Sequence, residues 1–128
     1  MRIFTALLLT IVTMSANATE PRRLAVTATA FNSTRAQTDS RPNEAACGDI
    51  LETGMRVIAV SRDLKKAGLS CGTQVQISGL EGNWTVVDLM AARHRNTIDI
   101  YMGKDIRAAR EWGRQELEIV WRGGPISR

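Results

Sequence analysis

The sequence predicts a mainly β fold, a small closed barrel of six strands with one or two short helices. Short segments of alternating or β-branched residues recur along the chain, and turns rich in glycine and polar residues separate them. Only one segment has a clear helical spacing of apolar residues. The chain is long enough for a single core, and closing the sheet removes the exposed edges that six short strands would otherwise leave.

Residues 1–18 have the pattern of a secretory signal peptide. Arg2 supplies a positive start, Ile3 to Met14 form an apolar run, and Ala16-Asn17-Ala18 is a small-x-small cleavage site. The run is short for a membrane span, although an uncleaved anchor is the alternative. We therefore expect a signal peptide over 1–18 and a single domain over 19–128, with its core at about 24–121.

The first half of the domain is predicted to hold two strands and a short helix. Leu24 to Phe31 is rich in alternating and β-branched residues and reads as the first strand. Asn32 to Glu44 is polar and predicts a long exposed loop. Met55 to Ser61 reads as the second strand, and Asp63 to Ala67 as one or two helical turns.

The second half is predicted to add four strands and the best helix. That helix covers 103–112, where Ile106, Ala109 and Trp112 share a face and Gly113 ends the helix. The strands are predicted at 74–78, 84–88, 97–101 and 117–121, with a frayed tail over 122–128.

Two cysteines, Cys47 and Cys71, remain after the predicted leader. An even number in an exported chain predicts a disulfide, with two buried thiols as the alternative. A nucleophilic cysteine is disfavoured because the single histidine, His94, lies in a basic run with no evident means of activating a thiolate.

The net charge is +4, and most of the basic residues are arginines. This surplus suits an anionic polymer such as the bacterial cell wall, and it equally suits solubility alone. One histidine and two paired cysteines supply no usual metal-ligand set, so we expect no metal and no cofactor. Nucleic acid is disfavoured as a partner because the chain has no aromatic-basic stripe and is predicted to be exported.

Two aspartates remain as candidates for acid–base chemistry. Asp88 ends the segment WTVVD and Asp99 lies inside TIDIY, each directly after an apolar residue. A carboxyl group half-enclosed by a barrel wall has a raised pKa, which would let it protonate a glycosidic oxygen near neutral pH. The alternative is that each aspartate only caps a turn or accepts backbone N–H groups.

Six segments follow one another in an order that is similar to a known family. They are VTATAFNST, CGDILETGMRVIAVSRDL, GTQVQISGL, WTVVDLM, NTIDIYMG and AAREWGRQELEIVW. Together they resemble the three-aspartate (3D) domain, the double-psi β-barrel module of membrane-bound lytic transglycosylase A and of stationary-phase cell-wall enzymes. The resemblance covers about 24–121 and implies a double-psi barrel.

The resemblance assigns roles to two of the aspartates. Family members line one groove with three aspartates, of which the second falls on Asp88 and the third on Asp99. Asp99 is then the expected general acid and base, supported by Asp88. The implied reaction cleaves the MurNAc–GlcNAc β-1,4 bond without water and forms a 1,6-anhydro product, so a single carboxyl group can serve twice.

This chain departs from the family in two places. Ser61 stands at the position of the first aspartate, and Asp63, two residues later, is the candidate to reach the groove instead. The stretch after Asp88 is glycine-rich in the family, whereas here it is bulky and basic. Arg93 and Arg95 in this stretch are candidates for contacting wall carboxylates or phosphates.

Three further residues are substrate-binding candidates. Thr29 and Asn32 lie at the end of the first strand, where the resemblance places the start of the groove. Tyr101 shares the face of Asp99 on its strand and would bond to that carboxyl group or to a sugar hydroxyl.

The sequence therefore predicts a monomeric peptidoglycan-cleaving enzyme acting on glycan strands. The alternative is a catalytically inactive barrel that binds the wall or a partner, which Ser61 and the missing glycines favour. Export places the protein in the periplasm, peripherally on the outer membrane, or at the cell surface, and the sequence leaves that choice open.

Overall fold

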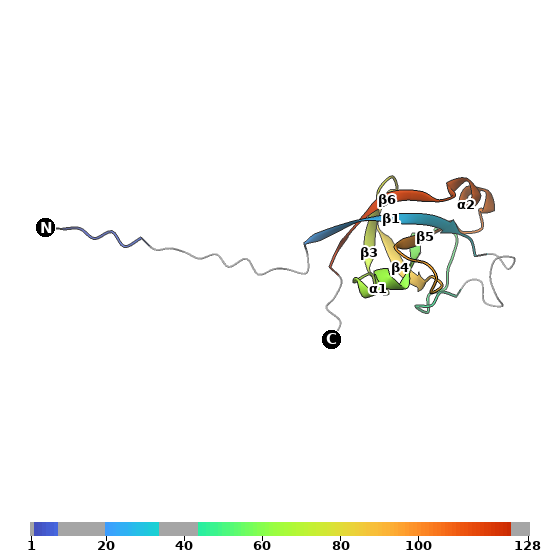
Figure 1. Cartoon of the computed structure of the whole chain (residues 1–128), viewed down its shortest axis with the longest axis horizontal. Coiled ribbons are helices and arrows are strands. Elements are labelled where there is room, and N and C mark those ends of the chain that lie inside the picture. The colour runs from blue at the N-terminus through green and yellow to red at the C-terminus, as the bar shows by residue number, and fades with distance from the viewer. Residues whose placement is uncertain (1, 8–19, 34–43, 124–128) are drawn as a thin grey trace.

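The computed structural model describes residues 2–7, 20–33 and 44–123. Most of the predicted signal peptide, most of the predicted loop over 32–44 and the end of the predicted tail lie outside the described residues. No helix within the described ranges is long and apolar enough to cross a bilayer. Figure 1 shows the barrel, with β1 and β6 side by side along it and α2 at one end of this pair.

The strands and helices follow one another in the order that the sequence pattern predicts. In chain order they are β1 (Pro21–Phe31), β2 (Val57–Val60), α1 (Arg62–Lys66), β3 (Gln74–Ile77), β4 (Trp84–Leu89), β5 (Thr97–Tyr101), α2 (Ile106–Trp112) and β6 (Gln115–Arg122).

The six strands close into a barrel in the order β1-β5-β2-β4-β3-β6. β1 runs parallel to β5 and β2 parallel to β4, while the other four neighbouring pairs are antiparallel. Parallel neighbours require crossover connections, which in so small a barrel pass over its ends. The predicted fold class, a mainly β six-stranded barrel with two short helices, is confirmed.

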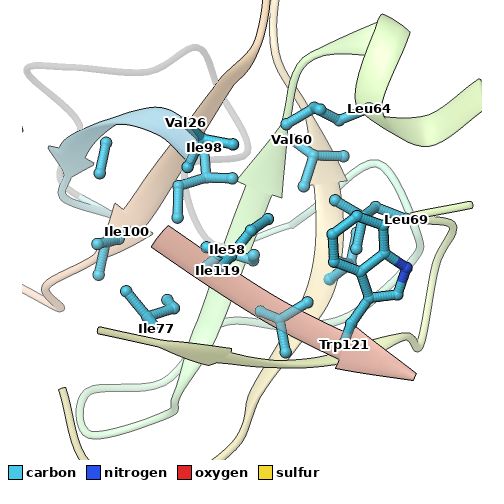
Figure 2. Packing of buried hydrophobic residues seen from close by; sticks show 13 residues of the cluster. Val26, Ile58, Val60, Leu64, Leu69, Ile77, Ile98, Ile100, Ile119 and Trp121 are labelled. Carbon is cyan, nitrogen blue, oxygen red and sulfur yellow. The ribbon is translucent and has the colours of Figure 1, made fainter. Parts of the chain in front are cut away.

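Alternating side chains from all six strands fill the barrel interior. In β3, Val75 and Ile77 are buried while Gln74 and Gln76 are exposed, as a two-residue repeat requires. Figure 2 shows Ile58, Ile119 and Trp121 among the side chains that meet inside the barrel. Because every strand supplies part of this core, the ends of the strands are held in fixed positions for the side chains described below.

A second, smaller apolar cluster packs on the outside of the barrel wall. Its members come from β1, β2, β4, β5 and the segment 44–56 before β2. They are Ala45, Leu51, Val57, Val87 and Tyr101, with Phe31 and Met55 partly buried against them. We call residues 44–47 the strap, because they lie along β4 and are fixed there by the bonds that follow.

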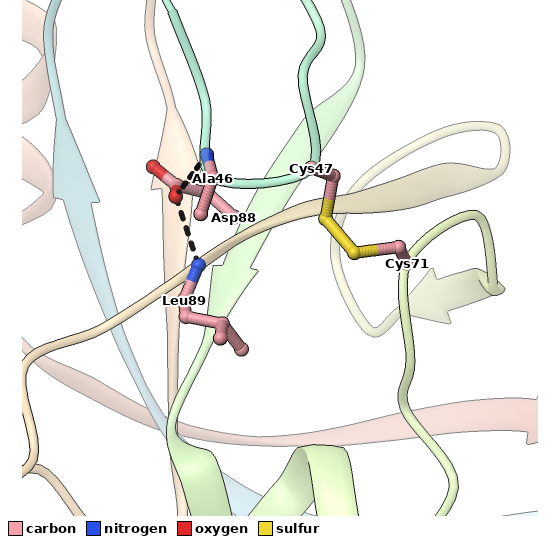
Figure 3. The surroundings of a disulfide bond; sticks show 5 residues. All are labelled: Ala46, Cys47, Cys71, Asp88 and Leu89. Carbon is pink, nitrogen blue, oxygen red and sulfur yellow. Dashed lines mark hydrogen bonds between the residues drawn. A yellow bond between two sulfur atoms is a disulfide. The ribbon is translucent and has the colours of Figure 1, made fainter.

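The predicted disulfide is confirmed and fixes the strap. Cys47 and Cys71 are bonded, with 5.9 Å between their Cα atoms, and close a separation of 24 residues. The backbone N–H of Cys47 donates to the carbonyl of Val87 in β4, 3.0 Å away. Figure 3 shows the disulfide beside the loop that crosses β4.

Several predicted boundaries were wrong by one to three residues, and the following differ most. β1 begins at Pro21 rather than Leu24 and β6 extends to Arg122, because Pro21 and Arg122 pair with each other. Arg122 is therefore strand and not part of a frayed tail. α2 begins at Ile106 rather than 103, because the side chain of Asp105 accepts the N–H of Ala108 and caps the helix there.

The second predicted strand was also too long. Pairing ends at Val60, and Ser61 is the N-cap residue of α1. The Ser61 side chain makes no capping bond and instead accepts the N–H of Thr97 at 3.0 Å. The end of β2 is thereby tied to the start of β5, directly beside the candidate site.

Candidate functional site

A row of four residues crosses four neighbouring strands of the barrel wall, β1, β5, β2 and β4. Thr29 in β1 pairs with Asp99 in β5, Asp99 pairs with Ala59 in β2, and Ala59 pairs with Asp88 in β4. Neighbouring strands are about 4.8 Å apart, so Asp88 and Asp99, two strands apart, have Cα atoms about 10 Å apart. Ala59 lies between them with the smallest side chain of the row, which leaves space above it.

That space is a cavity of about 190 Å³. Both Asp88 and Asp99 line it, so the two predicted carboxyl groups meet at one cavity. The remaining lining residues come from the end of β1, from β2, and from the connection after β4: Phe31, Asn32, Ala59, Leu89, Met90, Ala91 and His94.

Asp88 reaches this cavity because of a β-bulge. The register between β2 and β4 runs from Ile58 opposite Val86 to Ala59 opposite Asp88, so β4 contains one extra residue, Val87. In a regular register with no bulge, Val87 would pair with Ala59 and Asp88 would shift by one position, to the other face of the strand.

Asp99 is the partly buried position in an otherwise buried strand. Burial raises the pKa of its carboxyl group, and the negative charge of Asp88 adds to this increase. The hydroxyl of Thr29 donates to Asp99 Oδ1 at 2.8 Å and lowers the pKa in part, as does the charge of His94. The net result is that the pKa of Asp99 is raised above the ordinary value of an aspartate.

One carboxylate oxygen of Asp88 has a structural role. Its Oδ1 accepts the N–H of Ala46 at 2.7 Å and its own neighbour's N–H, that of Leu89, at 2.9 Å. Figure 3 shows both bonds beside the disulfide. One carboxylate oxygen thus holds the strap against β4, while Oδ2 makes no hydrogen bond to any described residue.

Asp63 does not line the cavity. Its Oδ2 accepts the backbone N–H of Asn96 at 2.9 Å, which fixes the turn just before β5. The hydrogen bond from the Ser61 side chain is the largest cause of a lowered pKa of Asp63, and the bond from Asn96 contributes too. Ser61, the other residue considered for this position, is fully buried.

Two of the predicted binding residues, Thr29 and Asn32, lie at or beside the cavity, and their roles differ. Thr29 bonds to Asp99, as described. Asn32 lines the cavity but is buried, and its side-chain nitrogen donates to the carbonyls of Gly103 and Asp105 at 3.2 and 3.0 Å. It therefore also shapes the loop before α2.

Tyr101 points to a neighbouring cavity of about 270 Å³ rather than to Asp99. Its hydroxyl is 2.6 Å from the hydroxyl of Ser33, and its ring centroid is 5.4 Å from that of Phe31. Arg93 and Arg95 are exposed on the connection between β4 and β5 and line neither of these two cavities.

His94 is the lining residue whose role the sequence reasoning missed. It lies on the connection between the two aspartates, where the N–H of His94 donates to the carbonyl of Ala91 and closes a turn. Its place in a basic run made it look unrelated to any acid–base group. Its position between Asp88 and Asp99 along the chain was the available signal.

Among the described residues, no three histidine, cysteine or acidic side chains are placed to hold a metal ion. What the cavity offers is one carboxyl group with a raised pKa, a second with a free oxygen, and hydroxyl and imidazole groups beside them. This arrangement suits proton transfer to and from an oxygen atom of a bound substrate.

Comparison with known proteins shows the fold of the chain. No protein-family model and no curated protein sequence matches it. The apo expansin of Clavibacter michiganensis is similar in structure, with a TM-score of 0.53 and 19% identity over 83% of this chain. A mutant of the expansin solved with cellohexaose has a TM-score of 0.47 and 16% identity over 84% of the chain.

The chain matches only about half of the expansin, 53% of the apo structure and 52% of the complex. The likeness therefore concerns one barrel and says nothing of the rest of that protein. The class defined by fold and site is a six-stranded barrel of the kind found in an expansin, with an acidic cavity on its wall.

Proposed function

We propose that this protein cleaves the MurNAc–GlcNAc β-1,4 bond of peptidoglycan as a lytic transglycosylase, with Asp99 as general acid and then general base. The observation that carries the proposal is the raised pKa of Asp99 at a cavity wall that also contains Asp88. A carboxyl group that holds its proton near neutral pH can give it to a leaving glycosidic oxygen.

The proposed reaction balances without water. Protonated Asp99 donates its proton to the glycosidic oxygen as the bond from that oxygen to C1 of MurNAc breaks. The resulting Asp99 carboxylate then takes the proton of the C6 hydroxyl of the same sugar, whose oxygen bonds to C1. The products are a 1,6-anhydro-MurNAc end and a free GlcNAc end, and Asp99 is protonated again.

The neighbours of Asp99 support this double use. The Thr29 hydroxyl donates to Oδ1, which orients the carboxyl group and leaves Oδ2 for the substrate. Asp88 adds negative charge, which favours the protonated form of Asp99 before the first step and stabilises positive charge developing on the sugar. Asp88 is therefore proposed as a positioning and electrostatic residue.

The second candidate is an inactive barrel that binds the wall. Two observations favour it: Ser61 is buried where the family has its first aspartate, and Oδ1 of Asp88 is already occupied by two backbone N–H groups. Residues from the connection after β4 also line the cavity and limit it to about 190 Å³.

A single assay separates the two candidates. The protein without residues 1–18 is incubated with purified peptidoglycan, and 1,6-anhydro-muropeptides are sought by mass spectrometry. We expect product from the wild type, a loss of about 100-fold or more in Asp99→Asn, and retention in Asp63→Asn. Binding to sacculi without any anhydro product would reject the enzyme and leave the wall-binding barrel.

We also propose that the protein works outside the inner membrane. The pattern of residues 1–18 supports export, and the Cys47–Cys71 disulfide fits an oxidising compartment. Alkaline phosphatase fused after residue 18 should be active in a bacterial host, whereas deletion of 2–18 should leave the fusion inactive in the cytoplasm.

A further inference from the structure

We propose that the outer face of β3, β6 and the start of β1 is a second binding site, for a glycan strand carrying N-acetyl and carboxylate groups. It lies apart from the Asp99 cavity and shares no lining residue with it. The site would hold the wall polymer while another stretch of the polymer enters the Asp99 cavity, and its existence does not depend on cleavage.

The site is a groove of about 640 Å³, larger than the cavity at Asp99. Its floor is built from strands in register: Arg23 in β1 pairs with Val120 in β6, and Val120 pairs with Gln76 in β3. Two residues further along both strands, on the same face, Pro21 pairs with Arg122. Figure 1 shows β1 and β6 running side by side over β3 in this part of the barrel.

Neutral amide groups are the first feature that points to a saccharide. Gln74 and Gln76 project outward from β3, and Asn83 in the turn before β4 also lines the groove; all three are exposed. Their amide groups make no hydrogen bond within the described part of the chain. Each amide offers both donors and an acceptor, which matches sugar hydroxyl and N-acetyl groups.

Two arginines among the lining residues are the second feature. Arg23 and Arg122 line the groove, and none of its described lining residues is acidic. Arg23 has a surface ion pair with Glu118 at 3.1 Å, but its side chain remains 65% exposed and can reach a ligand. Such a groove favours a strand bearing carboxylates, as muramic acid and its peptides do.

An apolar floor is the third feature. Val120 and Pro21 lie between the polar groups. The faces of sugar rings carry C–H groups and pack on such surfaces, while the ring hydroxyls reach the amides at the sides.

The test uses the protein without residues 1–18 carrying Asp99→Asn, so that the polymer stays intact. Glycan strands stripped of their peptides, intact sacculi and chitotetraose are the probes. Gln74→Ala combined with Gln76→Ala should weaken binding about 10-fold, whereas Gln115→Ala, at the other end of β6, should leave it unchanged. Arg23→Ala should weaken binding to the stripped strands, whose muramic acids carry free carboxylates, more than binding to chitotetraose, which carries none.

Backbone NMR shifts locate the contact directly. Added chitotetraose or stripped strands should shift the amide signals of Gln76 and Val120 as well as those around Asp99. Shifts confined to the Asp99 cavity, or equal affinity in the double variant, would overturn the second site. Tight binding to anionic lipid vesicles or DNA that the glycan does not displace would overturn its ligand assignment.

Failure here and failure of the proposed function are distinguishable. The double variant with Asp99 restored should still form anhydro product from short soluble strands, since none of the changed residues touches that cavity. If product is absent while glycan binding maps to Gln76 and Val120, the second site stands and the transglycosylase does not.

Discussion

Asp99 lies in the middle of β5, opposite Ala59 of β2, whereas Asp63 lies just beyond the end of β2, and the pKa values of the two carboxyl groups move in opposite directions. Asp99 is buried beside Ala59 with a single hydroxyl donor, and its pKa is raised. Asp63 follows β2, accepts the N–H of Asn96 and a bond from Ser61, and has a lowered pKa. Burial with a single donor favours the protonated form of a carboxyl group, whereas hydrogen-bond donors at a turn favour its ionised form.

The largest effect is expected from the disulfide that fixes the strap on the Asp99 side. Replacing both cysteines by serine, Cys47→Ser with Cys71→Ser, should lower the free energy of unfolding by about 3 kcal/mol, because the bond closes a loop of 24 residues. Urea denaturation of the variant measures the loss, with wild-type protein as reference.

Loss of the disulfide should affect the surroundings of the strap and leave those of Asp63 unchanged. The strap contacts Asp88 and not Asp63, so the pKa of Asp63 should stay the same in the cysteine variant. A changed pKa of Asp63 would mean that the surroundings of Asp63 depend on the strap.

Asp63→Ala should lower stability by about 1 kcal/mol at neutral pH, because the N–H of Asn96 loses its acceptor. The pKa of Asp63 is lowered in the folded state, so its contribution is present above the unfolded-state pKa and is lost as pH falls through the folded-state pKa. Thermal melts from pH 7 to pH 2 test this.

The matched control for that variant is Glu81→Ala, an exposed acidic side chain in the turn before β4. It should change stability little at any pH. Equal losses in the two variants would show that the bond to Asn96 contributes nothing.

Asp99→Asn should have the opposite sign and a smaller size. The folded protein holds the Asp99 proton more tightly than the unfolded chain, so ionising Asp99 costs stability above its folded-state pKa. Asparagine removes this cost. The variant should therefore be more stable than wild type at neutral pH, and the gain should shrink as pH falls below the folded-state pKa and be gone below the unfolded-state pKa.

A loss of stability in Asp99→Asn at pH 7 would contradict the raised pKa. Carbon-13 NMR of the labelled carboxyl groups gives a direct second reading, since it follows the titration of Asp99 and Asp63 in one sample.

The smallest effect is expected at the hydroxyl that bonds to Asp99. Thr29→Val removes a donor that lowers the pKa of Asp99, so this pKa should rise further, and the pH range of the proposed cleavage should extend upward. Thr27→Val is the control: it lies two residues earlier in β1, and its hydroxyl bonds to Glu116 instead. An equal shift in both variants would remove the assigned role of Thr29.

The local sequence predicts the elements of this fold well. The segment TIDIY was predicted as a strand to the exact residue, because alternation and β-branching agree in it. The ends of β1 and β6 were missed because Pro21 to Arg23 and Gln115 to Glu116 are polar, and pairing with each other rather than alternation makes them strand.

The candidate site was harder to predict, because it depends on which strands are neighbours. Asp88 and Asp99 were identified from their positions after apolar residues, but their meeting at one cavity depends on β2 lying between β4 and β5. Asp63 and Tyr101 were also plausible candidates. Asp63 instead bonds to the turn before β5, and Tyr101 lines a second cavity. No local pattern encodes these placements.

The bulge at Val87 has a consequence for how this barrel can change over time. In a regular ladder that kept all residues of β4, Val87 would stand opposite Ala59 and Asp88 would turn to the other face of the strand. Deletion of Val87 would instead restore regular pairing and leave Asp88 opposite Ala59, so the acidic wall of the cavity can survive a change in the length of β4.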